Sequence, residues 1–136
     1  MISSYNSATQ TVALGSAYEF DTNRILTGCT AIHTPGTAVF TLTKPGYYYV
    51  TFNTTFTTEA TGTATVELRN GGVAVPGASG AETITTAGDT KSIAFSTIVK
   101  VLPSCAAIDN TATLTFVATT LALDATVAAV EITKLC

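Results

Sequence analysis

The stretch that decides the fold is YYYVTFNTTFT, residues 47–57. Aromatic and β-branched residues fill it, and both classes favour extended strands. Because side chains alternate between the two faces of a strand, the stretch predicts one apolar face and one mixed face. The apolar face carries Tyr48, Val50, Phe52, Thr54 and Phe56, and the mixed face carries Tyr47, Tyr49, Thr51, Asn53 and Thr55.

Turn residues separate this strand from shorter runs on both sides. KPG at 44–46, NGG at 70–72 and PG at 76–77 are turn signals, because Gly and Asn tolerate positive φ and Pro presets its own φ. Between the turns, apolar and polar residues alternate with the period of a strand. The runs predict strands over residues 11–14, 30–33, 38–43, 63–70, 73–75, 82–86, 91–102, 111–119 and 126–135, with loops at 78–81 and 103–110.

A helix competes with strands at one place, residues 117–130, where apolar residues are dense enough to fit either period. Thr119-Thr120 and Thr126-Val127 disfavour a helix, so we expect two strands around a turn near Leu123-Asp124. The chain then holds eight to ten strands and no helix of any length. Two packed antiparallel sheets are the natural arrangement, and a jelly roll is the leading topology.

Composition supports this reading and excludes several classes of function. Only 11% of the 136 residues are charged, so the residues that normally cover exposed helix faces are scarce. Mean hydropathy is +0.40, which is too apolar for an intrinsically unfolded chain. The net charge is -3 and the sequence offers no basic patch to bind phosphates, so nucleic-acid binding is not predicted. Polar residues interrupt every apolar run well before the length of a membrane span, so no membrane insertion is expected.

The first ten residues, MISSYNSATQ, are small and polar, which predicts a flexible N-terminal arm over 1–10 and a jelly-roll domain over 11–136. Such an arm could reach a neighbouring subunit, or a capsid or tail protein. The segment lacks the charged start and apolar core of a secretory signal, so synthesis in the cytosol is expected. The thiols of Cys29, Cys105 and Cys136 are too few and too widely spaced for a disulfide framework.

No set of residues forms a credible catalytic or cofactor site, so the sequence predicts a protein that is not an enzyme. His33 is the one histidine, and it precedes a Thr-Pro-Gly turn rather than a nucleophile motif. Zinc would need several His, Cys or carboxylate ligands, and no metal or cofactor is expected. Glu19 and Asp21 lie two residues apart and are read as a solvated pair, since calcium requires six to eight oxygens.

Two segments carry a family resemblance: FTLTKPGYYYV at 40–50 and VELRNGGVAVPG at 66–77. They resemble the C1q/tumour-necrosis-factor-like jelly rolls of bacterial and phage surface proteins, including the tip domain of collagen-like spore-coat glycoproteins of Firmicutes. The resemblance covers about residues 36–135 and implies a ten-stranded jelly roll and a homotrimer. It suggests as interface residues Tyr47, Tyr49, Phe52, Phe56, Ile98 and Val117, and leaves open which sheet face turns toward the trimer axis.

The predicted function is structural and binding. The collagen-like stalk of the spore-coat proteins is missing from this sequence, which favours a virion component: a capsid decoration protein, head fibre or tail-tip module with a host surface ligand such as a glycan. The alternative is a bacterial cell- or spore-surface adhesin-like domain that binds glycans. A carbohydrate-active enzyme is the third reading, and it would need two carboxylates facing each other across a groove.

Overall fold

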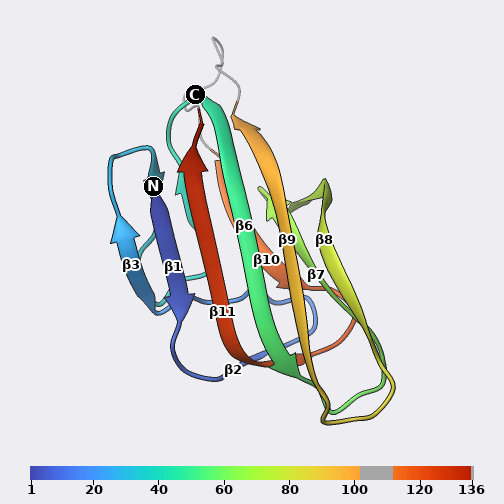
Figure 1. The fold of residues 1–136 in the computed structure, drawn as a ribbon. Helices are drawn as coiled ribbons and strands as arrows, with labels where there is room; N and C mark the ends of the chain where they lie inside the picture. Colours follow the sequence, from blue (N-terminus) through green and yellow to red (C-terminus); the bar gives the residue numbers. More distant parts are fainter. Residues whose placement is uncertain (102–111, 136) are drawn as a thin grey trace.

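The computed structural model describes residues 1–101 and 112–135, and Figure 1 shows them as two β-sheets packed face to face. The front sheet of Figure 1 has the order β3-β1-β11-β6-β9, with β2 also paired to β11. Its strands are β1 (Ile2–Asn6), β2 (Gln10–Val12), β3 (Thr22–Leu26), β6 (Gly46–Thr57), β9 (Thr90–Val101) and β11 (Leu123–Lys134). The back sheet has the order β4-β5-β10-β7-β8. Its strands are β4 (Ala31–Ile32), β5 (Phe40–Leu42), β7 (Gly62–Asn70), β8 (Val73–Ile84) and β10 (Ala112–Ala118).

The predicted all-β antiparallel sandwich is confirmed. Eleven strands are described rather than ten, because β1 and β3 lie outside the predicted runs, while the predicted runs 73–75 and 82–86 form one strand, β8. The turn expected near Leu123-Asp124 lies just before β11, and β10 ends at Ala118. No helix that could cross a membrane occurs among the described residues. The predicted loop at 103–110, with Cys105, and the terminal Cys136 lie outside them.

Strand β6 organises the front sheet. It pairs with β9 over its whole length, from Gly46 opposite Val101 to Thr57 opposite Thr90, without a register shift. On its other side it pairs with β11. Because β9 and β11 are both long, their inward and outward side chains follow the alternation of β6 across all three strands. The side chains that β6 turns inward therefore define the centre of the core.

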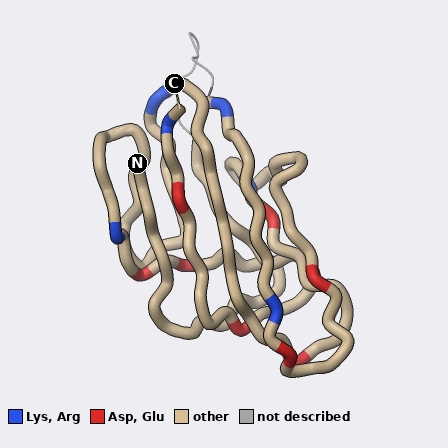
Figure 2. Tube along the Cα trace, in the orientation of Figure 1, with Lys and Arg blue, Asp and Glu red and all other residues tan. Residues whose placement is uncertain are grey.

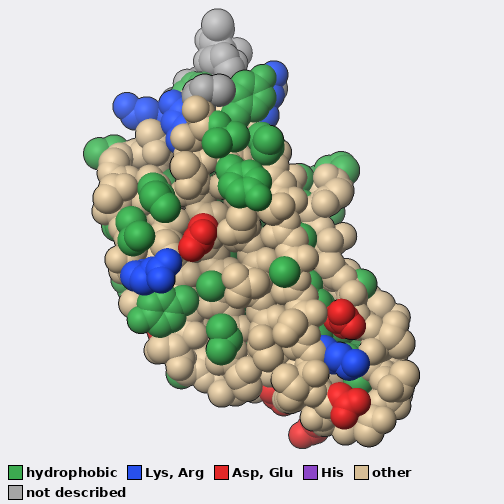
Figure 3. Space-filling view, viewed as in Figure 1, with side chains coloured by type: hydrophobic (Ala, Val, Ile, Leu, Met, Phe, Trp, Pro, Cys, Tyr) green, Lys and Arg blue, Asp and Glu red, His purple; other side chains and the backbone are tan. Residues whose placement is uncertain are grey.

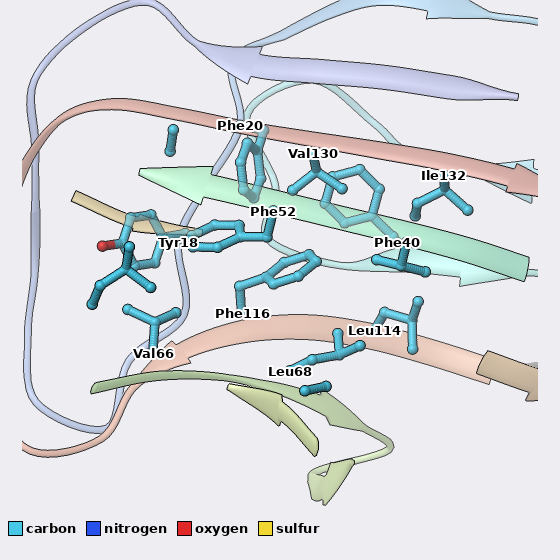
Figure 4. Close-up of a cluster of buried hydrophobic side chains, with 14 of the residues drawn as sticks. Tyr18, Phe20, Phe40, Phe52, Val66, Leu68, Leu114, Phe116, Val130 and Ile132 are labelled. Atoms are coloured by element: carbon cyan, nitrogen blue, oxygen red, sulfur yellow. The ribbon is translucent and has the colours of Figure 1, made fainter. Parts of the chain in front are cut away.

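The core is built around aromatic rings from both sheets (Figure 4). Phe52 of β6 stacks on Phe116 of β10, with ring centroids 4.7 Å apart and an interplanar angle of 12°. Tyr18 meets Phe52 edge-on at 5.3 Å, and Thr54 Oγ1 lies 3.4 Å from its hydroxyl. Burial raises the pKa of Tyr18 to about 12, so this ring stays neutral. Aromatic pairs of these geometries add about 0.5–1.5 kcal/mol each beyond the burial of their surface.

The expectation of a flexible arm over residues 1–10 is wrong for β1. This strand lies between β3 and β11 and pairs with both. Ile2 is fully buried, Ser4 is 1% exposed, and the Ser4 hydroxyl donates to Asn23 Oδ1 at 2.6 Å. The segment looks like an arm because the inward position between Ile2 and the end of the strand is held by Ser4, whose burial depends on a hydrogen-bond partner elsewhere in the chain.

A second correction concerns residues 78–81, which were expected to form a loop. They belong to β8, which runs without interruption from Val73 to Ile84. Gly80 is required there by close approach to β9, since a Cβ atom at this position would lie 2.5 Å from Ile93 Cγ2. The small residues that suggested a loop are thus needed because the edge strands β8 and β9 of the two sheets come into contact here.

Replacing Phe52 by alanine should lower the free energy of unfolding by about 3–5 kcal/mol, because it removes the ring shared by the two sheets and leaves a cavity. Denaturant titration of the Phe52→Ala variant measures this loss. Thr51→Ala, on the outer face of the same strand, is the control and should change stability little. A loss for Phe52→Ala no larger than that of the control would contradict the central place of this ring.

Replacing Gly80 by alanine should cost about 1–3 kcal/mol, the usual penalty for inserting a methyl group into a packed site. The new Cβ would press on Cγ2 of Ile93, a β-branched side chain whose χ1 angle is restricted. If the clash is the cause, the loss in the double variant Gly80→Ala with Ile93→Ala should be smaller than the sum of the losses in the two single variants. A loss equal to or greater than that sum would rule the clash out.

Candidate interface on the front sheet

The outer face of the front sheet carries exposed apolar side chains at one end. Tyr47 and Tyr49 of β6 are 41% and 42% exposed, and Ile98 of β9 is 55% exposed. Ile98 lies directly opposite Tyr49, and Lys100 lies opposite Tyr47 with its ammonium 5.5 Å from the ring centre. We call Tyr47, Tyr49 and Ile98 the tyrosine patch. Figure 3 shows hydrophobic side chains gathered over the upper ends of β6 and β9.

Three other predicted interface residues are not on the surface of the protomer. Phe52 and Phe56 are 1% and 0% exposed, because they share the inward-facing positions of β6 with Tyr48 and Val50. Val117 is 4% exposed and forms an isolated bridge with Ala17. The prediction of these three residues as interface is therefore wrong. The alternation of β6 separates them from the tyrosine patch, and only the burial of one whole face shows which half belongs inside.

The rest of this face is polar but almost uncharged. Below the tyrosine patch, β6 and β9 present threonine, serine and asparagine side chains, among them Thr55 and Ser92, whose hydroxyl oxygens are 3.1 Å apart. Figure 2 shows that charged residues are sparse along the front sheet and lie mostly toward its ends. A surface with few charges has little electrostatic repulsion to oppose contact with another protein.

The patch adjoins the β9 edge of the front sheet, which Gly80 of β8 approaches near Ile93 and which carries Lys91 and Lys100. Among the described residues, β9 is hydrogen-bonded to a neighbouring strand on one side alone, and between Lys91 and Lys100 it has no charge, proline or glycine. The other edges are blunted: β3 has five residues, β4 has two, and β8 contains Pro76-Gly77. Open backbone groups at a strand edge invite pairing with another chain.

His33 is a structural residue in this fold. Its ring is 3% exposed and stacks on Phe40 with centroids 4.3 Å apart. Nδ1 lies 2.6 Å from Asn23 Oδ1 and Nε2 lies 2.9 Å from the Thr37 carbonyl oxygen, while Asn23 Nδ2 donates to the His33 carbonyl at 2.7 Å. Both ring nitrogens are thus occupied in joining β3 to the back-sheet edge, and the ring faces no nucleophile.

The predicted acidic pair, Glu19 and Asp21, does not act as one unit, because the two residues have different contacts. Asp21 accepts hydrogen bonds from the hydroxyls of Ser7 and Thr22 and from the Ser7 backbone, and the Ser7 hydroxyl contributes most to holding the pKa of Asp21 below its ordinary value. Glu19 is exposed, and its backbone amide donates to the side chain of Gln10.

No group of three or more His, Cys, Asp or Glu side chains with metal-ligand geometry occurs in the described part of the chain. Cys29 is exposed.

Known proteins resemble this chain in structure and not in sequence. No protein-family model and no curated protein matches the sequence. A crystal structure of murine APRIL superposes with a TM-score of 0.62 at 9% identity, covering 98% of each chain. The PRD1 vertex protein P5 superposes with a TM-score of 0.53 at 13% identity, covering 99% of this chain and 96% of that one. The fold is a jelly roll. At these identities the likeness establishes the fold alone.

Acidification should weaken the jelly roll through His33. Burial, the larger effect, lowers the pKa of His33 below 6.5, and the hydrogen bond to the Thr37 carbonyl opposes it in part. The folded protein therefore prefers the neutral ring, so this stabilisation is complete above pH 6.5 and is lost as the pH falls through the lowered value. Thermal melting at pH 7.5 and pH 5.5 should show a lower midpoint at pH 5.5.

The His33→Gln variant is the control, because the chain has no other histidine and carboxylates titrate mainly below this window. Its midpoint should vary less between pH 7.5 and pH 5.5 than that of the native protein. A native midpoint that rises at pH 5.5 would show instead that the two oxygen atoms facing the ring favour the imidazolium.

Proposed function

We propose that this chain is a non-enzymatic structural and binding protein that assembles as a homotrimer on a virion surface, as a capsid decoration protein, head fibre or tail-tip module. The observation that carries the proposal is the tyrosine patch beside the open edge of β9. Isolated monomers rarely expose apolar surface next to an open strand edge. Burial of both in a self-contact removes two unfavourable features of the protomer together.

The geometry of these two surfaces favours a ring over a two-fold dimer. The tyrosine patch lies on a sheet face and β9 forms an edge, so a contact that joins the face of one copy to the edge of the next uses different surfaces on each partner. Contacts of this heterologous kind generate closed rings when the rotation permits. The family resemblance of residues 40–50 and 66–77 implies three copies.

The structural likeness to the PRD1 vertex protein P5 supports the virion location. Attachment through an N-terminal arm is not part of this proposal, because Ile2–Asn6 is an interior strand of the front sheet. We place attachment to a capsid or tail protein at one end of the sandwich, and leave the other parts of the surface free for a host ligand such as a glycan. The non-enzymatic role is supported by the fully occupied ring of His33.

The trimer is tested by the mass in solution, measured by light scattering. Reductant is included because Cys29 is exposed. The native chain should give a mass near three times 13.9 kDa. A double variant, Tyr49→Asp with Ile98→Asp, should give a monomer with unchanged β-sheet circular dichroism, because desolvating two carboxylates in the contact costs several kcal/mol.

The matched control is Val73→Asp, which puts the same charge on a side chain that is 70% exposed at the start of β8 in the back sheet. It should remain trimeric. A native monomer, or a trimer that survives the double variant, would overturn the proposed assembly. Immunogold labelling then tests the location: labelled particles support the virion role, whereas label confined to cell or spore surfaces would favour the adhesin-like alternative.

A further inference from the structure

A shallow groove crosses the front sheet on the opposite side of β11 from the tyrosine patch. It lies over β1, β3 and β11 and has a volume of about 460 Å³, within the range of small-ligand sites. In this region Figure 3 shows a basic and an acidic side chain side by side, with a hydrophobic side chain next to them. The groove is lined by Ser3, Ser4, Tyr5, Arg24, Ala129 and Glu131.

The pairing of β1 with β11 explains the shape of the groove. Ser3 lies opposite Glu131 and Tyr5 lies opposite Ala129, so each cross-strand pair sets a small side chain against a large one. The two large side chains, Tyr5 and Glu131, stand on different strands and at different levels. Because Arg24 covers Ser3, the hollow lies beside the small side chain of Ala129, and Tyr5 and Glu131 are among the residues that line it.

The polar groups of the groove are held in place but not saturated. Arg24 Nη2 donates to Ser3 Oγ at 3.0 Å and lies 3.5 Å from Glu131 Oε1. A guanidinium carries five N–H donors and a carboxylate about four acceptor sites, and the side chains of Arg24 and Glu131 are 62% and 53% exposed. Most of their hydrogen-bonding capacity therefore points to solvent beside an aromatic ring that is 37% exposed.

We infer that this groove binds an uncharged pyranose ring, with Tyr5 against the apolar face of the sugar and Arg24 and Glu131 bonded to adjacent hydroxyl groups. A hydroxyl accepts from the guanidinium and donates to the carboxylate, so a vicinal diol satisfies both groups without separating the ion pair. Tyrosine supplies the combination of apolar surface and polar edge that such ligands need. The inference rests on the proposed binding role and names the class of its ligand.

Charged ligands fit the groove less well. A phosphate or carboxylate drawn to Arg24 would meet Glu131 within the same pair, on a protein whose net charge is -3. A cation drawn to Glu131 would meet Arg24 in the same way. Either ligand would lie beside a like charge, which is unfavourable, whereas a neutral polyhydroxyl ligand would not.

The test is saturation-transfer difference NMR on the full chain with the methyl glycosides of glucose, galactose, N-acetylglucosamine and N-acetylgalactosamine, and with glucose 6-phosphate as the charged comparison. At least one neutral glycoside should receive saturation at its ring protons. Tyr5→Ala should weaken its binding about threefold to tenfold, and Glu131→Gln should weaken it as well. Ala129→Leu fills the hollow without removing a polar group, and it should abolish the signal.

Two matched controls lie outside the groove. Glu59→Gln removes one exposed negative charge, as Glu131→Gln does, and Leu14→Ala removes an exposed apolar side chain, as Tyr5→Ala does. Both controls should bind as the native protein does. No transfer to any neutral glycoside, transfer to glucose 6-phosphate alone, or transfer unchanged in Tyr5→Ala and Ala129→Leu would overturn the inference.

The mass of the same samples separates this inference from the proposed function. A trimer that binds no glycoside refutes the groove and leaves the assembly standing. A monomer that binds a glycoside, with loss in the groove variants, refutes the trimer and supports the groove.

Discussion

The pleat of β6 controls both the inside and the outside of this protein. Alternation sends Phe52 and Phe56 into the sandwich and Tyr47 and Tyr49 to the outer face. The unshifted pairing of β6 with β9 then sets Ile98 beside Tyr49. The stack of Phe52 on Phe116 fixes which face is inner, because it joins the front sheet to β10 of the back sheet. A one-residue slip of β6 would exchange the two faces.

The alternation of β6 also explains why the front sheet has chemically different areas although the chain has few charges. Once the rings of β6 are divided between core and exterior, the remaining outer positions are filled by threonine, serine and asparagine. These side chains keep the face hydrated without setting up electrostatic repulsion. The protomer therefore offers three different surfaces on one sheet: an apolar patch at one end of β6 and β9, a neutral polar area below it, and a polar groove across β1 and β11.

Local pattern predicts most of this fold and much less of its surface. The alternation of residues 47–57 and the turns at 44–46 and 70–72 were sufficient for the sandwich, because period and turn chemistry are local properties. The pairing of Ile2–Asn6 with β3 and β11 was missed, since the burial of Ser4 depends on Asn23, nineteen residues away along the chain. Gly80 was read as a loop residue because the approach of Ile93 is a tertiary contact.

The candidate interface shows the same limit. Periodicity separates Tyr47 and Tyr49 from Phe52 and Phe56, yet both sets are aromatic, and hydrophobicity alone does not say which set faces a partner. Val117 was misplaced because its cover comes from the segment around Ala17, a hundred residues earlier in the chain. The groove carried no sequence signal, because its lining residues are brought together by the register of β1, β3 and β11.

Hydroxyl-radical footprinting of the native assembly tests the central claim most directly, since three tyrosines of similar exposure lie on one sheet. Tyr5, Tyr47 and Tyr49 are 37%, 41% and 42% exposed in the protomer. If the tyrosine patch is covered by a second copy and the groove is open, Tyr47 and Tyr49 will be oxidised much more slowly than Tyr5. Equal rates at all three tyrosines would contradict burial of the patch in the assembly.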